Sequence, residues 1–156
     1  MAEESGFIQG ELYRNSNFVH PKNKKILYYH CTNYYFETEQ DDDFRKYGKS
    51  KENRPNPIVS MGLFMDADGI PFAFDVFPGN QNEQPTLKPL ETKVIRDFAC
   101  GGLIFCSDAG LDSKSNRRLN SFGYRSYVII QSLKKMRGED RQTALNPKQF
   151  CRPGSD

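Results

Sequence analysis

An apolar run that ends on an aspartate, with a glycine turn directly after it, constrains the fold of this chain more than any other feature. The run covers residues 103–107, and Asp108, Ala109 and Gly110 follow it. Such a run is typical of a buried strand, and α/β proteins place metal-binding and phosphate-binding groups at the carboxyl ends of these strands. Asp108 is therefore a candidate for metal binding and catalysis. The residues alone fit a turn aspartate before a glycine equally well.

Five strands are expected along the chain, and they cover residues 26–36, 58–65, 70–77, 103–107 and 127–131. The second and third flank a turn that contains Asp68 and Gly69, so they should form a hairpin. Apolar residues at helical spacing between positions 87 and 98 predict a helix. A shorter helix should begin after Asp112 or Ser113, with Leu119 and Phe122 on its inner face.

The order of these elements is three strands, a helix, a strand, a helix and a strand. Short links make the first three strands antiparallel, whereas helical crossovers make the last two parallel to a neighbour. This predicts an α/β fold with a ribonuclease-H-like mixed five-stranded sheet and flanking helices, incomplete at its C-terminal end. In that fold the first and fourth strands are adjacent, which would bring His30 beside Asp108.

The length of 156 residues suits one domain. We expect an arm or linker at residues 1–23, a partial ribonuclease-H-like domain at 24–136 and a polar, frayed tail at 137–156. The four cysteines form no C-x-x-C pair, which argues against a zinc site. The sequence has neither a secretion signal nor an apolar stretch long enough for a membrane span, so we expect a cytoplasmic protein without a membrane partner.

Positive residues gather in clusters, although the net charge is only +2. A solvated surface explains any single cluster, whereas several clusters near strand ends favour a phosphate-binding face. Three clusters are Lys22, Lys24 and Lys25; Arg117 and Arg118; and Lys134, Lys135 and Arg137. The densest cluster lies in the loop at 37–57 and is our candidate DNA-binding site: Arg45, Lys46, Lys49, Lys51 and Arg54.

Several segments, in this order, resemble the DDE transposases of bacterial insertion sequences, in the branch whose catalytic domain carries a large β-rich insertion. They are residues 26–36, RKYGKSKENRPNP at 45–57, MGLFMDADGIP at 61–71, VFPGN at 76–80, TLKPL at 86–90 and CSDAGL at 106–111. The resemblance implies a nuclease and strand-transferase core that binds transposon-end DNA and uses Mg²⁺ or Mn²⁺ held by three acids. It places Asp108 among those acids, as a metal ligand and catalytic residue.

Two departures from the family pattern affect the predicted activity. His30 stands where the family has its first aspartate, within the otherwise matching context Tyr29-His30-Cys31-Thr32-Asn33. The family's third acid, a glutamate on a late helix, has no counterpart among these residues. A neutral imidazole offers one nitrogen lone pair and no negative charge, and it suits transition metals better than Mg²⁺. We therefore expect a truncated, inactive transposase fragment that does not bind Mg²⁺ as the intact family does.

Two other functions remain open. The chain could be a non-catalytic module that binds DNA or a full-length transposase and modulates an intact element. It could also be a distinct metal-dependent nuclease in which His30 is a genuine ligand.

Overall fold

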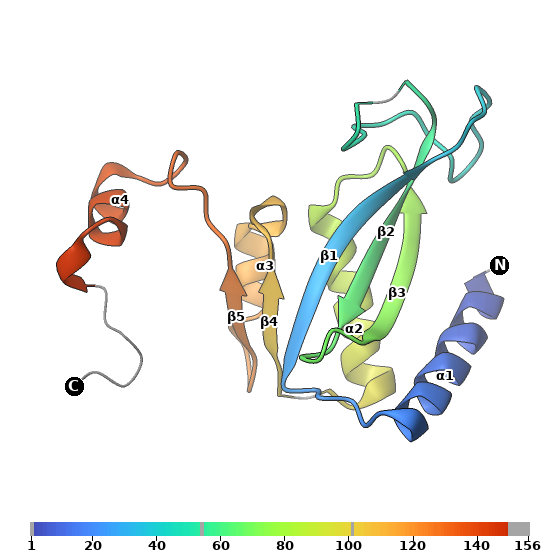
Figure 1. Ribbon diagram of the computed structural model, residues 1–156, viewed down its shortest axis with the longest axis horizontal. Helices are drawn as coiled ribbons and strands as arrows, with labels where there is room; N and C mark the ends of the chain where they lie inside the picture. The colour runs from blue at the N-terminus through green and yellow to red at the C-terminus, as the bar shows by residue number, and fades with distance from the viewer. Residues whose placement is uncertain (1, 54, 101, 150–156) are drawn as a thin grey trace.

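The computed structural model describes residues 2–53, 55–100 and 102–149 (Figure 1). Its helices are α1 (Ala2–Val19), α2 (Leu87–Phe98), α3 (Lys114–Leu119) and α4 (Gly138–Ala144), and its strands are β1 (Ile26–Tyr35), β2 (Ile58–Met65), β3 (Pro71–Pro78), β4 (Ile104–Ser107) and β5 (Ser126–Ile129). Short 3-10 turns cover Gln84–Thr86, Ala109–Leu111 and Pro147–Gln149. The predicted strands and the predicted α2 helix are all present, with ends that shift by two residues at most.

The five strands form one mixed sheet in the order β3-β2-β1-β4-β5. β1 pairs antiparallel with β2, and β2 pairs antiparallel with β3. β4 runs parallel to both β1 and β5, because each crossover between these strands passes through a helix. This is the predicted ribonuclease-H-like arrangement, and it places the carboxyl ends of β1, β4 and β5 at one edge of the sheet.

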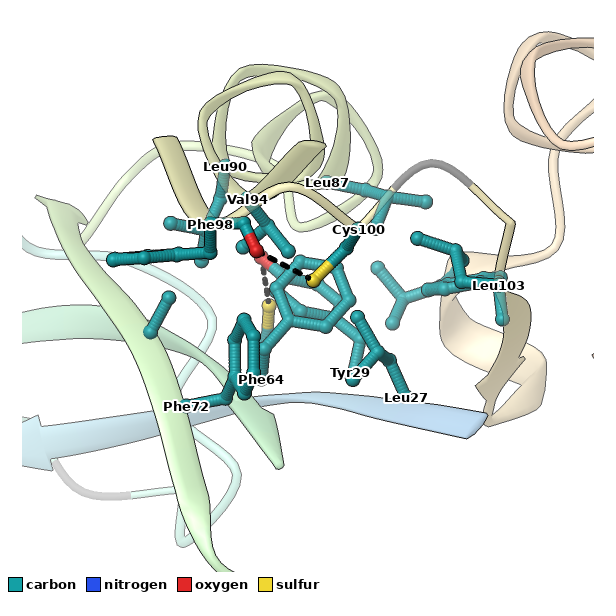
Figure 2. Close-up of a cluster of buried hydrophobic side chains, with 14 residues drawn as sticks. Leu27, Tyr29, Phe64, Phe72, Leu87, Leu90, Val94, Phe98, Cys100 and Leu103 are labelled. Carbon is teal, nitrogen blue, oxygen red and sulfur yellow. Dashed lines mark hydrogen bonds between the residues drawn. The ribbon is translucent and has the colours of Figure 1, made fainter. Parts of the chain in front are cut away.

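The core lies between one face of this sheet and α2 (Figure 2). Alternate residues of β1, namely Leu27, Tyr29 and Cys31, are buried on this face, as the twofold periodicity of a strand requires. They pack with further buried side chains from β2, β3, α2 and β4: Phe64, Phe72, Leu87, Leu90, Val94, Phe98 and Phe105. The buried Tyr29 hydroxyl lies 2.7 Å from the Thr86 hydroxyl and makes a hydrogen bond with it.

The opposite face of the sheet is open. Figure 1 shows α2 and α3 behind the strands, and no described helix covers the front. Tyr28 and Tyr34 project from β1 on this face and are 42% and 51% exposed, respectively. His30 lies between them in the alternation and is also exposed, so position 30 belongs to the open face rather than to the core.

The loop between β1 and β2 is fastened to the sheet by close backbone packing. Lys46 and Ile58 exchange backbone hydrogen bonds of 3.0 and 2.9 Å, and the Gly79 amide donates to the Phe44 carbonyl at 3.0 Å. A Cβ atom on Gly79 would lie 2.0 Å from the Ile58 carbonyl oxygen, and one on Gly48 would lie 2.1 Å from that of Gly79. Only glycines permit this stack, which holds the charged loop against the end of the sheet.

Three expectations need correction. Residues 1–23, expected to form an arm, contain the helix α1, whose Tyr13 packs against Phe72 and Phe98 with ring centroids 5.4 and 4.3 Å apart. The tail expected to be frayed contains α4 as far as it is described, and residues 150–156 lie outside the described part. The helix α3 ends at Leu119, so Phe122 lies beyond it and is 57% exposed instead of packing inward.

Within the described residues, no helix combines the length and the apolar character that crossing a bilayer requires.

Candidate functional site

The register of β1 against β4 places the two predicted site residues side by side. Tyr29 is opposite Ser107 in the parallel pairing, so the next residues along each strand are His30 and Asp108. The His30 Nδ1 atom lies 3.5 Å from the Asp108 Oδ2 atom, and the two side chains are 52% and 43% exposed. The predicted juxtaposition is therefore confirmed. The contact is long for a hydrogen bond and is an ion pair only when the imidazole is protonated.

Asp108 also caps the turn that follows it. Its Oδ1 atom accepts a hydrogen bond of 3.0 Å from the Gly110 amide, which leaves Oδ2 directed at His30. The interpretation of Asp108 as a turn residue and its interpretation as a site residue are thus compatible, since each uses a different carboxylate oxygen. The cap fixes the carboxylate at the carboxyl end of β4 without consuming the oxygen that faces β1.

These donors do not fit a pair of divalent metal ions. Mg²⁺ prefers several hard oxygen ligands, and a two-metal site needs bridging carboxylates for ions ~3.5–4 Å apart. Here one carboxylate faces one imidazole, which brings no negative charge. Among the residues that the structure describes, no group of three or more His, Cys, Asp or Glu side chains is placed to hold a metal ion.

Glu83 is a neighbouring carboxylate that the sequence analysis did not single out. Its Oε2 atom and the Asp108 Oδ1 atom lie 3.4 and 3.3 Å, respectively, from the position that a Cβ on Gly110 would occupy. The Lys51 ammonium lies 3.6 Å from the Glu83 Oε1 atom and donates a hydrogen bond to the Cys31 carbonyl. Lys51 thereby neutralises Glu83 and ties the β1–β2 loop to β1. Neither the spacing nor the residue types in the sequence could reveal this contact.

Two cavities adjoin the pair at this edge of the sheet. The first, which we term the basic cavity, has a volume of about 700 Å³ and is lined by Gln84, Ala109, Gly110, Asp112, Lys114, Arg117, Gln131, Ser132, Lys135, Met136, Arg137 and Asp140. The second, the amide cavity, has about 590 Å³ and is lined by Asn33, Lys49, Ser50, Lys51, Ser60, Gly79, Asn80, Gln81, Asn82, Glu83 and Gly110. Gly110, whose amide binds Asp108, lines both cavities, so they adjoin at the turn that follows Asp108, although neither His30 nor Asp108 lines them.

The predicted DNA-binding cations are largely engaged with carboxylates of their own loop and its surroundings. Arg45 Nε lies 2.7 Å from Asp42 Oδ2, and the hydrogen bonds from the Arg45 backbone and guanidinium lower the pKa of Asp42 to about 2. Lys46 pairs with Asp41 at 3.4 Å, and Lys51 pairs with Glu83 as described above. Lys49 is exposed and has no carboxylate within ion-pair distance among the described residues, while Arg54 lies outside them.

Buried ionisable groups elsewhere serve the core. Glu91 of α2 is 1% exposed and contacts Asn120 at 3.3 Å and Arg125 at 3.5 Å. Burial is the main cause that raises the pKa of Glu91, and the Arg125 charge opposes it. Burial likewise raises the pKa of the Tyr29 hydroxyl and of the Cys31 thiol, which are therefore neutral core groups.

Of the comparisons with known proteins, the one with solved structures gives matches. No protein-family model and no curated protein matches the chain. Among solved structures, a Mos1 transposase paired-end complex with the left transposon end matches with a TM-score of 0.45 and 14% identity, over 80% of this chain and 40% of that one. A Mos1 mariner paired-end complex with Mn matches with a TM-score of 0.43 and 11% identity, over 76% and 39%. The chain thus spans about two fifths of the length of these transposases.

Proposed function

We propose that this chain is part of the catalytic domain of a DDE transposase from the insertion-sequence branch with a β-rich insertion, and that it binds DNA without cleaving it. One observation carries the proposal: position 30 of β1 and Asp108 after β4 face each other at 3.5 Å. These are the positions at which the sequence resemblance places two of the family's acids. The motifs at 45–57, 61–71 and 76–80 support the insertion-sequence branch in particular.

The loss of activity follows from the chemistry of His30. Phosphodiester cleavage by this family would require carboxylates that bridge metal ions and stabilise the attacking and leaving oxygens. An imidazole beside Asp108 supplies at most one neutral nitrogen, and when protonated it repels a cation. His30 therefore stands beside Asp108 as the family's first acid would, but it lacks the negative charge on which metal binding depends.

A second candidate function is a non-catalytic module that binds DNA or an intact transposase. The observation that favours it is the same pair, because Asp108 already caps the following turn through the Gly110 amide and faces an imidazole instead of a second carboxylate. Under this proposal the ribonuclease-H-like scaffold acts only as a binding surface, and an intact transposase would be its further partner.

The test combines binding and cleavage of duplex DNA by the purified chain. We expect measurable, salt-dependent binding and no cleavage or strand joining with Mg²⁺ or Mn²⁺. Metal-dependent cleavage that disappears in Asp108→Ala would contradict the proposed inactivity and make His30 a ligand. Absence of any DNA binding at low salt would contradict the DNA-binding function itself. A change in the cleavage rate of an added intact transposase would select the modulating module.

A further inference from the structure

We propose that the basic cavity holds the phosphates of the bound DNA strand, through Lys114, Arg117 and Lys135, and that Arg45, Lys46 and Lys51 of the loop between β1 and β2 do not. This inference rests on the proposed function, because it states where the DNA of that function lies. It assigns the contacts to residues outside the cluster that the sequence singled out for DNA binding.

The basic cavity lies next to the turn that follows Asp108. One wall of the basic cavity is the turn of Ala109 and Gly110, which begins at Asp108 itself. The facing wall is the turn after β5, where the Lys135 amide donates a hydrogen bond of 2.9 Å to the Ser132 carbonyl. Since β4 and β5 are parallel neighbours, the segments that follow them meet at the same edge of the sheet. A strand lying in this cavity would therefore contact the turn that follows Asp108.

The basic cavity carries an excess of positive charge. Four cations and two carboxylates line the cavity, and the carboxylates pair with the two arginines: Arg117 with Asp112 at 3.3 Å, and Arg137 with Asp140 at 3.0 Å. Lys114 and Lys135 have no carboxylate within 4.0 Å among the residues that are described. The cavity thus keeps two uncompensated positive charges, which a phosphate backbone would neutralise.

Asp112 contacts two other residues that line the cavity, Arg117 and Gln131. Its Oδ1 atom is buried and lies against Arg117, while its Oδ2 atom is 3.5 Å from the Gln131 amide nitrogen. The Asp112 carboxylate thus lies between Arg117 of α3 and Gln131, two residues beyond β5, and its Oδ1 atom makes no hydrogen bond within the described residues. Arg117 can therefore offer its remaining N–H groups to a phosphate with little loss of side-chain freedom.

In the described part of the loop between β1 and β2, Arg45, Lys46 and Lys51 are paired with carboxylates, and Lys49 alone has none within 4.0 Å. Arg45 and Lys46 would have to give up Asp42 and Asp41 to bind a phosphate, so they would gain less than Lys114 or Lys135.

The experiment compares three double variants that each remove two lysine charges. K114Q/K135Q tests the basic cavity, K46Q/K49Q tests the loop, and K88Q/K93Q on α2 is the matched control. Binding of a fluorescent duplex is followed by anisotropy across a salt series. Each phosphate contact contributes ~0.9 to the log–log salt slope, so K114Q/K135Q should reduce the slope by ~1.8 and weaken binding ~60-fold at 0.1 M salt. The control should match the unmodified protein.

The outcomes separate this inference from the proposed function. A reduced slope in K46Q/K49Q, with K114Q/K135Q equal to the control, would overturn the inference and leave the proposed function standing. An unmodified protein without salt-dependent DNA binding would overturn both. Neither lysine of the cavity contributes to the core, so thermal melting of K114Q/K135Q should equal that of the control. As a second measurement, the backbone amide resonances of Gly110 and Ser132 should shift when duplex is added, and unchanged resonances in a saturated complex would also overturn the inference.

Discussion

Replacing His30 by aspartate should create a site that binds Mg²⁺, whereas we expect no such binding by the unmodified chain. The substitution removes the contact of 3.5 Å with Asp108 and sets two carboxylates face to face. An exposed ion pair is worth ~0–1 kcal/mol. Repulsion between unit charges ~4 Å apart is ~1 kcal/mol in water and ~4 kcal/mol near a protein surface. Since both side chains are about half exposed, the lower value applies, and we expect the metal-free variant to lose ~1–2 kcal/mol of unfolding free energy.

Divalent ions should reverse this loss in the variant alone. A ligand at 100 times its Kd adds ~2.7 kcal/mol to the stability of the folded state. At ~2–4 °C per kcal/mol for a chain of this size, His30→Asp should melt ~2–8 °C lower without metal and regain ~5–11 °C with saturating Mg²⁺. Differential scanning fluorimetry over a Mg²⁺ series measures both effects, and titration calorimetry gives the affinity.

Two matched variants make the result interpretable. His30→Asn removes the imidazole without adding charge and should show no response to Mg²⁺. Asp108→Asn in the His30→Asp background removes the second carboxylate and should abolish the response. If His30→Asp melts at the same temperature with and without Mg²⁺, position 30 and Asp108 do not form a carboxylate site, and the reasoning from their juxtaposition is wrong.

Three further predictions concern the loop, the buried glutamate and the packing of the sheet. Because Arg45, Lys46 and Lys51 are already paired, replacing these three residues and Lys49 by alanine should lower the salt slope of DNA binding by no more than ~0.9, the share of Lys49, whereas a fall near 3.6 would refute the pairing. Burial raises the folded-state pKa of Glu91 above its unfolded value, so its contribution to stability is fully present below the unfolded pKa and is lost as pH rises through the folded pKa. The stability of Glu91→Gln relative to the unmodified protein should therefore increase as the pH rises above the unfolded pKa of glutamate in urea unfolding, and a pH-independent difference would contradict this. Gly62→Ala would place a Cβ 2.2 Å from the hydroxyl of the buried Tyr29 and should cost ~1–3 kcal/mol, whereas Gly6→Ala on α1, with nothing within 4 Å, should not destabilise; equal melting of the two would show that Tyr29 can move.

The strand positions could be predicted because the residues of each strand carry their own evidence. β1 is rich in aromatic residues, and its successive side chains alternate between the core and the open face. The turn at Asp66–Gly69 separates β2 from β3. The neighbouring position of His30 and Asp108 then followed from the element order, which is that of the ribonuclease-H-like fold with its first and fourth strands adjacent, as β1 and β4 are here.

Features that depend on tertiary contacts could not be predicted in this way. The apolar residues of α1 do not form one continuous stripe, as the exposure of Phe7 and Phe18 shows, so the sequence lacks a clear helical pattern there. The contact of Lys51 with Glu83 joins residues 32 positions apart. It depends on the close packing of Gly48 and Gly79, which no local sequence pattern predicts. The two cavities likewise arise from turns that meet only when the sheet has formed.

The alternation of β1 explains how such a chain keeps its fold while its site changes. Tyr29 and Cys31 are buried and fill the core, whereas His30 between them projects from the open face and is half exposed. A substitution at position 30 therefore alters the charge opposite Asp108 without changing the volume packed against α2. Because the core face and the open face of β1 are separate, the His30 variants should differ strongly in their response to Mg²⁺ and only modestly in stability. A large loss of stability in His30→Asn, which adds no charge, would mean that position 30 supports the core, and the separation of scaffold from site in β1 would not hold.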